Sequence, residues 1–335
     1  MPALSPALAN GRVGAGPGAA AGEHTAAGLD AGQGRVAAAA APCGYACPMA
    51  TTTDFSPAGL AELARSDAAR ALAEDVGAGD LTAALVPAGR RARARILARQ
   101  PAVICGAAWV EAALRQLEPA ATVHWLVGEG QRTMADQVVA ELEGSARALL
   151  TAERTALNFL QLLSAVATQT ATYVEAVRGT RARIVDTRKT LPGLRLAQKY
   201  AVRTGGGTNH RIGLFDAVLI KENHIAAAGG VRQVLQAAAA VAAQAAFVEI
   251  EVETLDQLRQ ALDAGAAMVL LDNMDLPTLR EAVRINDGRA VLEISGGVTL
   301  ETVRALAETG VDRISIGALT KDVKAVDFSM RLKEL

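Results

Sequence analysis

Residues 184–224 read IVDTRKTLPGLRLAQKYAVRTGGGTNHRIGLFDAVLIKENH, and this stretch decides the fold. One short apolar run, residues 182–185, stops at Asp186, and a second run, residues 217–220, stops at Lys221. A Pro-Gly turn and a glycine triplet lie between the two runs. Apolar strands flanked by helical patterns indicate a parallel α/β sheet or barrel, in which the C-terminal strand ends form the ligand-binding face.

Positive charge follows both runs. Five side chains carry a positive charge or gain one on protonation: Arg188, Lys189, His210, Arg211 and Lys221. Each one alone would be an ordinary solvated loop residue. The glycine triplet is costly in backbone entropy unless the chain needs a positive φ or a close approach to a ligand there. Together these features predict a site for a small, multiply charged anion.

Composition sets the outer limits. The chain has 335 residues, 51% of them hydrophobic, and a formal net charge of -1, which predicts two domains and disfavours a nucleic-acid-binding protein. Three cysteines make no disulfide framework, and four histidines are too few for a zinc site, so we expect a protein of the reducing cytoplasm. We identify no signal peptide and no membrane segment.

The N-terminal third divides into two parts. Residues 1–50 are low-complexity Ala/Gly sequence that we expect to be disordered, with Met49 as an alternative start. From residue 54 an α+β pattern follows: Ser56 caps a helix that begins at Pro57. Further on we expect strands at 90–105, 122–127 and 138–142 and a helix at 109–117.

A long helix is predicted to start at Thr151 and to end at Gly179, joining this domain to the next. Arg154 would then lie in its first turn, where a cation opposes the helix dipole. Such a placement fits an external anion about as well as it fits an incidental surface arginine.

From residue 182 strands and helices alternate. The expected strands are 182–186, 217–221, 247–252, 268–272, 290–294 and 313–316, and the expected helices are 231–243, 255–264, 277–284 and 299–309. Successive right-handed βα units close into a barrel. The domain boundaries predicted overall are 1–50, 54–165 together with 322–335, and 166–321.

The strand ends of this barrel carry different chemistry in order. Cations follow the early strands, Glu249 and Glu251 share one face of the middle strand, and Asp272 with Asn273 follows the next. The late turns contain Ser295, Gly296, Gly297 and Gly317. Glycine turns before a helix expose N–H groups to phosphate, and neighbouring carboxylates hold Mg²⁺ or sugar hydroxyls. The pattern predicts a phosphorylated sugar beside a polycarboxylate.

Seven motifs follow one another along the chain: ERT at 153–155, DTRKT at 186–190, KYAVRTGGGTNHR at 199–211, IKENH at 220–224, EIE at 249–251, LDN at 271–273 and EISGG at 293–297. In this order they resemble the quinolinate phosphoribosyltransferase family, also called carboxylating nicotinate-nucleotide pyrophosphorylases. The resemblance covers about residues 71–330. It implies an α/β protein with an N-terminal α+β sandwich domain followed by an incomplete, TIM-like α/β barrel.

The resemblance also implies roles for single residues. Quinolinate carboxylates would be held by Arg154, Arg188, His210 and Arg211, with Arg154 supplied by the neighbouring subunit of a homodimer or hexamer. Lys189 and Lys221 would lie between quinolinate and the pyrophosphate. Glu251 and Asp272 would bind ribose hydroxyls and Mg²⁺, and the 5-phosphate would contact Ser295, Gly296, Gly297 and Gly317.

The implied activity is that of a glycosyltransferase of the pentosyl class in NAD biosynthesis. It joins quinolinate to 5-phosphoribosyl-1-pyrophosphate and releases nicotinate mononucleotide, pyrophosphate and CO₂. Three alternatives stay open. They are a sister phosphoribosyltransferase that takes another aromatic acid, a Schiff-base aldolase that uses Lys221, and a binding protein without catalysis.

Overall fold

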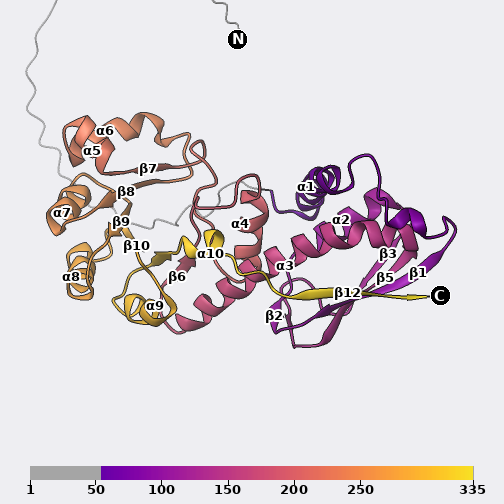
Figure 1. The fold of residues 1–335 in the computed structure, drawn as a ribbon. Helices are drawn as coiled ribbons and strands as arrows, with labels where there is room; N and C mark the ends of the chain where they lie inside the picture. The colour runs from indigo at the N-terminus through magenta and orange to yellow at the C-terminus, as the bar shows by residue number, and fades with distance from the viewer. Residues whose placement is uncertain (1–53, 335) are drawn as a thin grey trace, which may run out of the picture. The chain divides into compact units, whose positions relative to one another are not determined.

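The computed structural model describes residues 54–334 (Figure 1). The expectations for residues 1–50 and for Met49 as an alternative start lie outside the described residues, as do two of the three cysteines, Cys43 and Cys47. Cys105, the cysteine inside the described part, is buried and forms no disulfide there.

A mixed helix-and-sheet domain opens the described chain. Its elements are α1 (Pro57–Val76), the 3₁₀ helix η1 (Ala83–Leu85), β1 (Arg91–Ala98), β2 (Ala102–Val103), α2 (Ala107–Leu117), β3 (Thr122–Trp125), β4 (Arg132–Thr133) and β5 (Gln137–Ser145). The last strand of the chain, β12 (Phe328–Glu334), pairs with β1, which gives an antiparallel sheet of order β12-β1-β5-β3. β2 and β4 pair separately.

The alternation expected near residue 90 is present in β1, although the strand ends at Ala98 instead of running on to residue 105. Ala94 and Ile96 are buried against α2 and α3. On the opposite face Arg93 and Arg95 pair across the sheet with glutamates of β5, at 3.0 and 2.9 Å. This basic face is therefore a solvated surface of the sheet.

The long helix α3 (Ala146–Ala176) begins earlier than expected. Its N-cap is Ser145, and the hydroxyl of Thr151 donates instead to Asp80 at 2.8 Å. Arg154 lies eight residues after the first helical residue, more than two turns inside the helix. The expectation that Arg154 opposes the helix dipole in the first turn is therefore wrong, because dipole effects fade within that turn.

Six parallel strands form the second sheet. They are β6 (Arg183–Val185), β7 (Val218–Ile220), β8 (Val248–Val252), β9 (Met268–Asp272), β10 (Val291–Ser295) and β11 (Arg313–Ser315). The strand order is β6-β11-β10-β9-β8-β7, and no pairing joins β6 to β7 among residues 54–334. The expected incomplete α/β barrel is confirmed, and its open seam lies between β6 and β7.

Seven helices accompany these strands in the described chain. They are α4 (Arg195–Thr204), α5 (Glu222–Ala228), α6 (Val231–Ala242), α7 (Leu255–Asp263), α8 (Leu276–Asn286), α9 (Leu300–Ala307) and α10 (Ala318–Lys321), of which α4, α5 and α10 were not expected. No single helix of the described chain is long and apolar enough to cross a membrane. The pair α5 and α6 meets that test only when joined across a bend of 98°.

The two faces of the parallel strands differ in chemistry. Ile250, Leu271 and Ile294 belong to the apolar core between the strands and the surrounding helices. The residues that precede two of them, Glu249 and Glu293, are fully buried and lie outside that apolar core. Because side chains alternate along a strand, the inner face of the barrel is polar where the outer face is apolar.

The glycine triplet serves helix packing. A Cβ on Gly205 would lie 2.4 Å from the carbonyl oxygen of Ala167, and one on Gly207 would lie 2.8 Å from Thr170 Cγ2, both in α3. Gly206 has φ 88°, which favours glycine. The positive φ expected in the triplet is present at Gly206, but the close approach is to helix α3 instead of the expected ligand, and it seats α4 against that helix.

Gly205→Ala should therefore overpack the α3–α4 contact and lower the free energy of unfolding by about 1–3 kcal/mol, measured by urea denaturation. Gly89→Ala is the matched control, because a Cβ there meets nothing within 4 Å. Equal stability of both variants would contradict the packing explanation.

Candidate active site

A pocket of about 250 Å³ opens at the C-terminal ends of the barrel strands. Its lining residues come from the loop after β6, from the segment between α4 and β7, from the start of the α5 region after β7, and from the five strands β7 to β11: Thr187, Arg188, Lys189, His210, Arg211, Leu219, Lys221, Glu251, Leu270, Glu293, Ser295 and Ser315. Each of these strands ends at the same rim because the sheet is parallel. The five cationic positions expected from the sequence all line this one pocket.

Positive charge dominates the pocket. Arg188 and Lys189 form no ion pair within residues 54–334, and Lys221 pairs with Glu251 at 3.1 Å. Burial first, and then the neighbouring Arg188, lowers the pKa of Arg211, which marks the two guanidinium groups as close neighbours. Two neighbouring arginines, neither of which is ion-paired within residues 54–334, are arranged for a bidentate partner such as a planar carboxylate.

Five expected site residues are not among those that line the pocket: Arg154, Asp272, Gly296, Gly297 and Gly317. Asp272 is close enough to Glu251 for its charge to help burial raise the pKa of Glu251. A Cβ on Gly317 would lie 2.9 Å from Lys189 Cδ, so this glycine leaves room for the lysine stem. Arg154 is exposed on α3 and forms no ion pair with any residue from 54 to 334.

The turn after β10 is built around two glycines. Gly296 and Gly297 have φ values of 99° and 58°, and a Cβ on Gly296 would lie 2.3 Å from Asn273 Oδ1. Both glycines are exposed, next to the half-buried Ser295. An exposed backbone turn that excludes side chains presents N–H groups to an anion.

A charged cluster lies at the floor of the pocket. His210 Nε2 is 2.8 Å from Glu249 Oε2 and 3.6 Å from Glu293 Oε1. Arg313 Nε donates to Glu293 Oε2 at 2.6 Å. All four side chains are buried, so the cluster exchanges solvent contacts for contacts among its own charges.

His210 uses both ring nitrogens within the protein. Its Nδ1 accepts the backbone N–H of Arg211 at 2.8 Å, which requires Nδ1 to be unprotonated, so Nε2 carries the proton toward Glu249. Burial opposes a positive charge on this ring, but Glu293 and Glu249 outweigh burial and raise the pKa of His210. In this arrangement the hydrogen bond accepted by Nδ1 decides the protonation state of the ring. The imidazole is the neutral Nε2–H tautomer.

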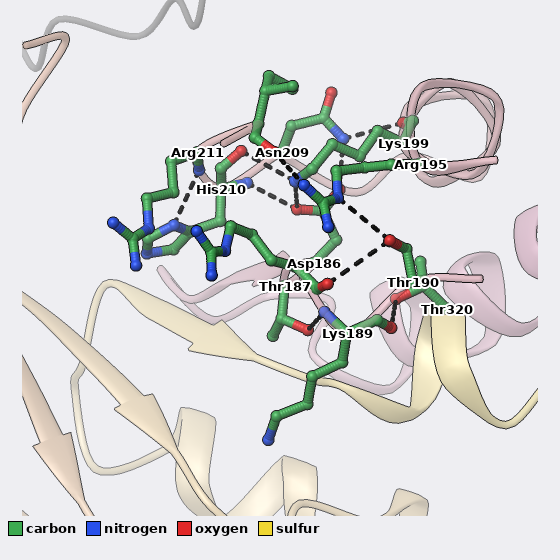
Figure 2. A network of polar contacts seen from close by, with 12 residues as sticks. Asp186, Thr187, Lys189, Thr190, Arg195, Lys199, Asn209, His210, Arg211 and Thr320 are labelled. Atoms are coloured by element: carbon green, nitrogen blue, oxygen red, sulfur yellow. Dashed lines mark hydrogen bonds and ion pairs between the residues drawn. The ribbon is translucent and has the colours of Figure 1, made fainter. Parts of the chain in front are cut away.

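The two loops that carry the cations are held by a polar network (Figure 2). Thr320 Oγ1 donates to the carbonyl of Lys189 at 2.8 Å, and Arg195 Nε donates to Thr190 Oγ1 at 3.1 Å. Lys199 Nζ, from helix α4, donates to Asp186 Oδ1 at the start of the first loop at 2.5 Å and to the carbonyl of His210 in the second loop at 3.0 Å. These contacts therefore hold the cationic loops in place from within the protein.

Oxygen donors suited to a divalent cation lie at two neighbouring strand ends. Glu251 and Asp272 are half-buried there, on β8 and β9. Mg²⁺ takes oxygen ligands and keeps several waters, so two carboxylates beside an open pocket fit it. His210, Glu249 and Glu293 also place ligand atoms within 4.8 Å of one another, but this cluster includes a nitrogen and is buried.

Sequence reasoning missed several residues of this region. Glu293 and Ser315 line the pocket, and Arg313 supports its floor, yet none had an expected role. Their signal was present in the period of two along each strand, since Glu293 precedes Ser295 by two and Arg313 precedes Ser315 by two. The same spacing had placed Glu249 and Glu251 on one face.

A larger hollow, about 590 Å³, lies on the solvated face of the four-stranded sheet. Its lining includes the Arg93–Glu143 and Arg95–Glu141 pairs, whose charges neutralise each other. It lacks the concentration of unpaired cations that marks the barrel pocket.

Comparisons with known proteins agree with this geometry. Residues 80–164 and 166–331 match the family descriptions "Quinolinate phosphoribosyl transferase, N-terminal domain" and "Quinolinate phosphoribosyl transferase, C-terminal domain". The chain is 44% identical over 281 residues to the carboxylating nicotinate-nucleotide pyrophosphorylase of Mycobacterium leprae, covering 81% of this chain and 98% of that protein. It is 41% identical over 257 residues to a probable enzyme of the same name from Bacillus subtilis, covering 77% and 89%.

A solved structure extends the agreement to three dimensions. The nicotinate-nucleotide pyrophosphorylase of Francisella tularensis superposes with a TM-score of 0.79 at 43% identity, covering 82% of this chain and 97% of that chain. The resemblance carried by the sequence motifs is thereby confirmed. The chain belongs to the quinolinate phosphoribosyltransferase family.

Proposed function

We propose that this protein transfers the phosphoribosyl group of 5-phosphoribosyl-1-pyrophosphate to quinolinate, with loss of CO₂, to give nicotinate mononucleotide and pyrophosphate. The observation that carries the proposal is the barrel pocket, in which two arginines that form no ion pair within the described chain lie beside two lysines and the carboxylate of Glu251. Such a pocket accommodates a dianionic acid next to a phosphorylated sugar. The family assignment supports this choice of substrates.

The cationic residues of the pocket fall into two groups, one for the carboxylates of quinolinate and one for the pyrophosphate. Arg188 and Arg211 hold the carboxylates of quinolinate as bidentate forks. Lys189 and Lys221 lie between the acid and the departing pyrophosphate, where they stabilise negative charge. His210, neutral and bonded to Glu249, orients Arg211 through its ring nitrogen and adds a wall of the pocket.

The sugar end has its own partners. Glu251 and Asp272 bind ribose hydroxyls, and the turn formed by Ser295, Gly296 and Gly297 binds the 5-phosphate with its N–H groups. Gly317 extends the same phosphate site next to Lys189.

Catalysis under this proposal needs no protein nucleophile. The pyridine nitrogen of quinolinate forms a bond to C1 of the ribose while the bond from that carbon to the pyrophosphate oxygen breaks. The carboxylate next to the ring nitrogen then leaves as CO₂, its bonding electrons pass to the cationic ring, and a proton replaces it. The protein contributes positioning and charge stabilisation.

Glu251 and Asp272 would also hold Mg²⁺ together with oxygens of the substrate. When bound, the ion neutralises charge on the leaving pyrophosphate. A cytoplasmic location stays a prediction that rests on the cysteine content of the sequence.

Arg154 has a separate place in the proposal. It is exposed, it lies outside the pocket lining, and it forms no ion pair with the described residues. We assign it to the pocket of a second copy in a homodimer or hexamer, where it would meet a carboxylate of quinolinate.

The test of the function is an assay with quinolinate, phosphoribosyl pyrophosphate and Mg²⁺ that follows nicotinate mononucleotide and CO₂. Product should form from quinolinate, and much less should form when nicotinate replaces it, since one carboxylate then lacks a partner. Chelation with EDTA should abolish turnover, and added Mg²⁺ should restore it. Absence of product from quinolinate under all conditions would refute the proposed function.

The shared pocket predicts complementation. Arg154→Ala and Arg188→Ala should each be inactive, while a refolded mixture should recover up to roughly a quarter of the wild-type activity, because one intact pocket forms in each mixed dimer. Arg232→Ala, on the exposed surface of α6, is the control and should leave activity unchanged. Mixed oligomers that form and stay inactive would show that Arg154 does not act across an interface.

A further inference from the structure

A buried ion pair lies behind the pocket, outside its lining. Asp186 follows β6 and Lys199 lies on α4, both side chains are 0% exposed, and Nζ to Oδ1 measures 2.5 Å. Burial raises the pKa of Asp186 and lowers that of Lys199, so the surroundings oppose both charges. Stability alone does not explain a buried ion pair, because an apolar pair of similar volume often stabilises a fold as well or better.

The Asp186–Lys199 pair forms hydrogen bonds with the backbone of His210. Asp186 Oδ1 accepts the backbone N–H of His210 at 2.8 Å, and Lys199 Nζ donates to the backbone carbonyl of His210 at 3.0 Å. Asn209 Nδ2 donates to Asp186 Oδ2 at 2.6 Å and to the carbonyl of Lys199 at 2.9 Å. Both backbone polar groups of one residue, His210, are thus held by the two opposite charges.

The segment held in this way, residues 208–211, lies at the open seam of the barrel. Thr208 N donates to Ile184 O at 2.8 Å and Asp186 N donates to Thr208 O at 3.1 Å, so the segment pairs with the edge strand β6. On the other side of the seam Arg211 Nη1 donates to Ala217 O at 3.3 Å, just before β7. The segment therefore spans the gap between β6 and β7, and strand pairing alone fixes only its first residue.

Arg211 depends on this arrangement. Its backbone N–H donates to His210 Nδ1, and its side chain lines the pocket. In Figure 2 Asp186, Lys199 and Asn209 gather on one side of His210, while the Arg211 side chain extends away from them. A shift of the His210 backbone would move the guanidinium with it, and displacements of about 1 Å can cost roughly 100-fold in rate.

We propose that Lys199 and Asp186 are positioning residues, which hold the His210 backbone across the barrel seam so that Arg211 meets the aromatic acid. The inference rests on the proposed function for the identity of the acid. It assigns to the pair a role in binding quinolinate and none in binding phosphoribosyl pyrophosphate, because neither residue contacts the Lys221, Glu251 or Ser295 side of the pocket.

The experiment uses the full-length double variant Asp186→Asn/Lys199→Met, which removes both charges together and leaves no uncompensated buried ion. We expect a folded protein whose KM for quinolinate rises about 10-fold or more, while its KM for phosphoribosyl pyrophosphate stays within about 2-fold of wild type. A purely structural pair would change the melting temperature and leave both KM values in place. A folded double variant with an unchanged KM for quinolinate would therefore overturn the inference.

Two further variants make the result decisive. Leu114→Ala, in the core of the N-terminal domain, is the matched control for lost stability and should leave both KM values unchanged. Asn209→Ala removes the amide tether but keeps the ion pair, so it serves if the double variant fails to fold; it should raise the KM for quinolinate about 3-fold. An unchanged KM in that variant would again overturn the inference.

The proposed function and the inference fail in different ways. If the wild-type protein forms no product from quinolinate, the proposed function is refuted, and the inference loses its substrate. If the wild-type protein turns over quinolinate and the folded variants bind it equally well, only the inference is refuted.

Discussion

The contact between helices α3 and α4 is the constraint on which the active site depends. Gly205 and Gly207 let the end of α4 approach α3 so closely that no side chain fits between them. Helix α4 then carries two buried residues toward the cationic loops: Gln198 holds Leu191 and Thr320, and Lys199 holds Asp186 and His210. The position of one helix thereby sets the geometry of both loops.

The inner face of the barrel carries polar and charged side chains at the active site, where other barrels have apolar packing. Glu249, Glu293, Arg313 and His210 fill space that aliphatic side chains would occupy in a barrel built for stability alone. The three charges are tolerated because Arg313 pairs with Glu293 and the neutral His210 donates to Glu249, both at hydrogen-bonding distance. The apolar residues that alternate with them bury the outer face under the helices, and this face contributes the hydrophobic stabilisation of the domain.

The features that depend on local sequence pattern, the barrel strands and the cationic positions at their ends, could be predicted from the sequence. The six barrel strands were found to within one residue at each end because each is a short apolar run, and the five cationic positions meet because parallel strands share one rim. Helix α4 was missed because it is short and because the glycines that flank it, Gly193 and the triplet that begins at Gly205, suggested a loop. The start of α3 was misplaced because Thr151 is a good capping residue whose hydroxyl is committed to Asp80, a contact between residues far apart in sequence.

A crystal structure of the protein with quinolinate tests the central claim most directly, because the claim is that contacts within the protein place Arg188 and Arg211 to receive the acid. The account predicts that quinolinate lies between Arg188 and Arg211, with the His210 backbone displaced by less than about 1 Å from its position here. Quinolinate bound away from these two arginines, or a rearranged segment 208–211, would contradict it.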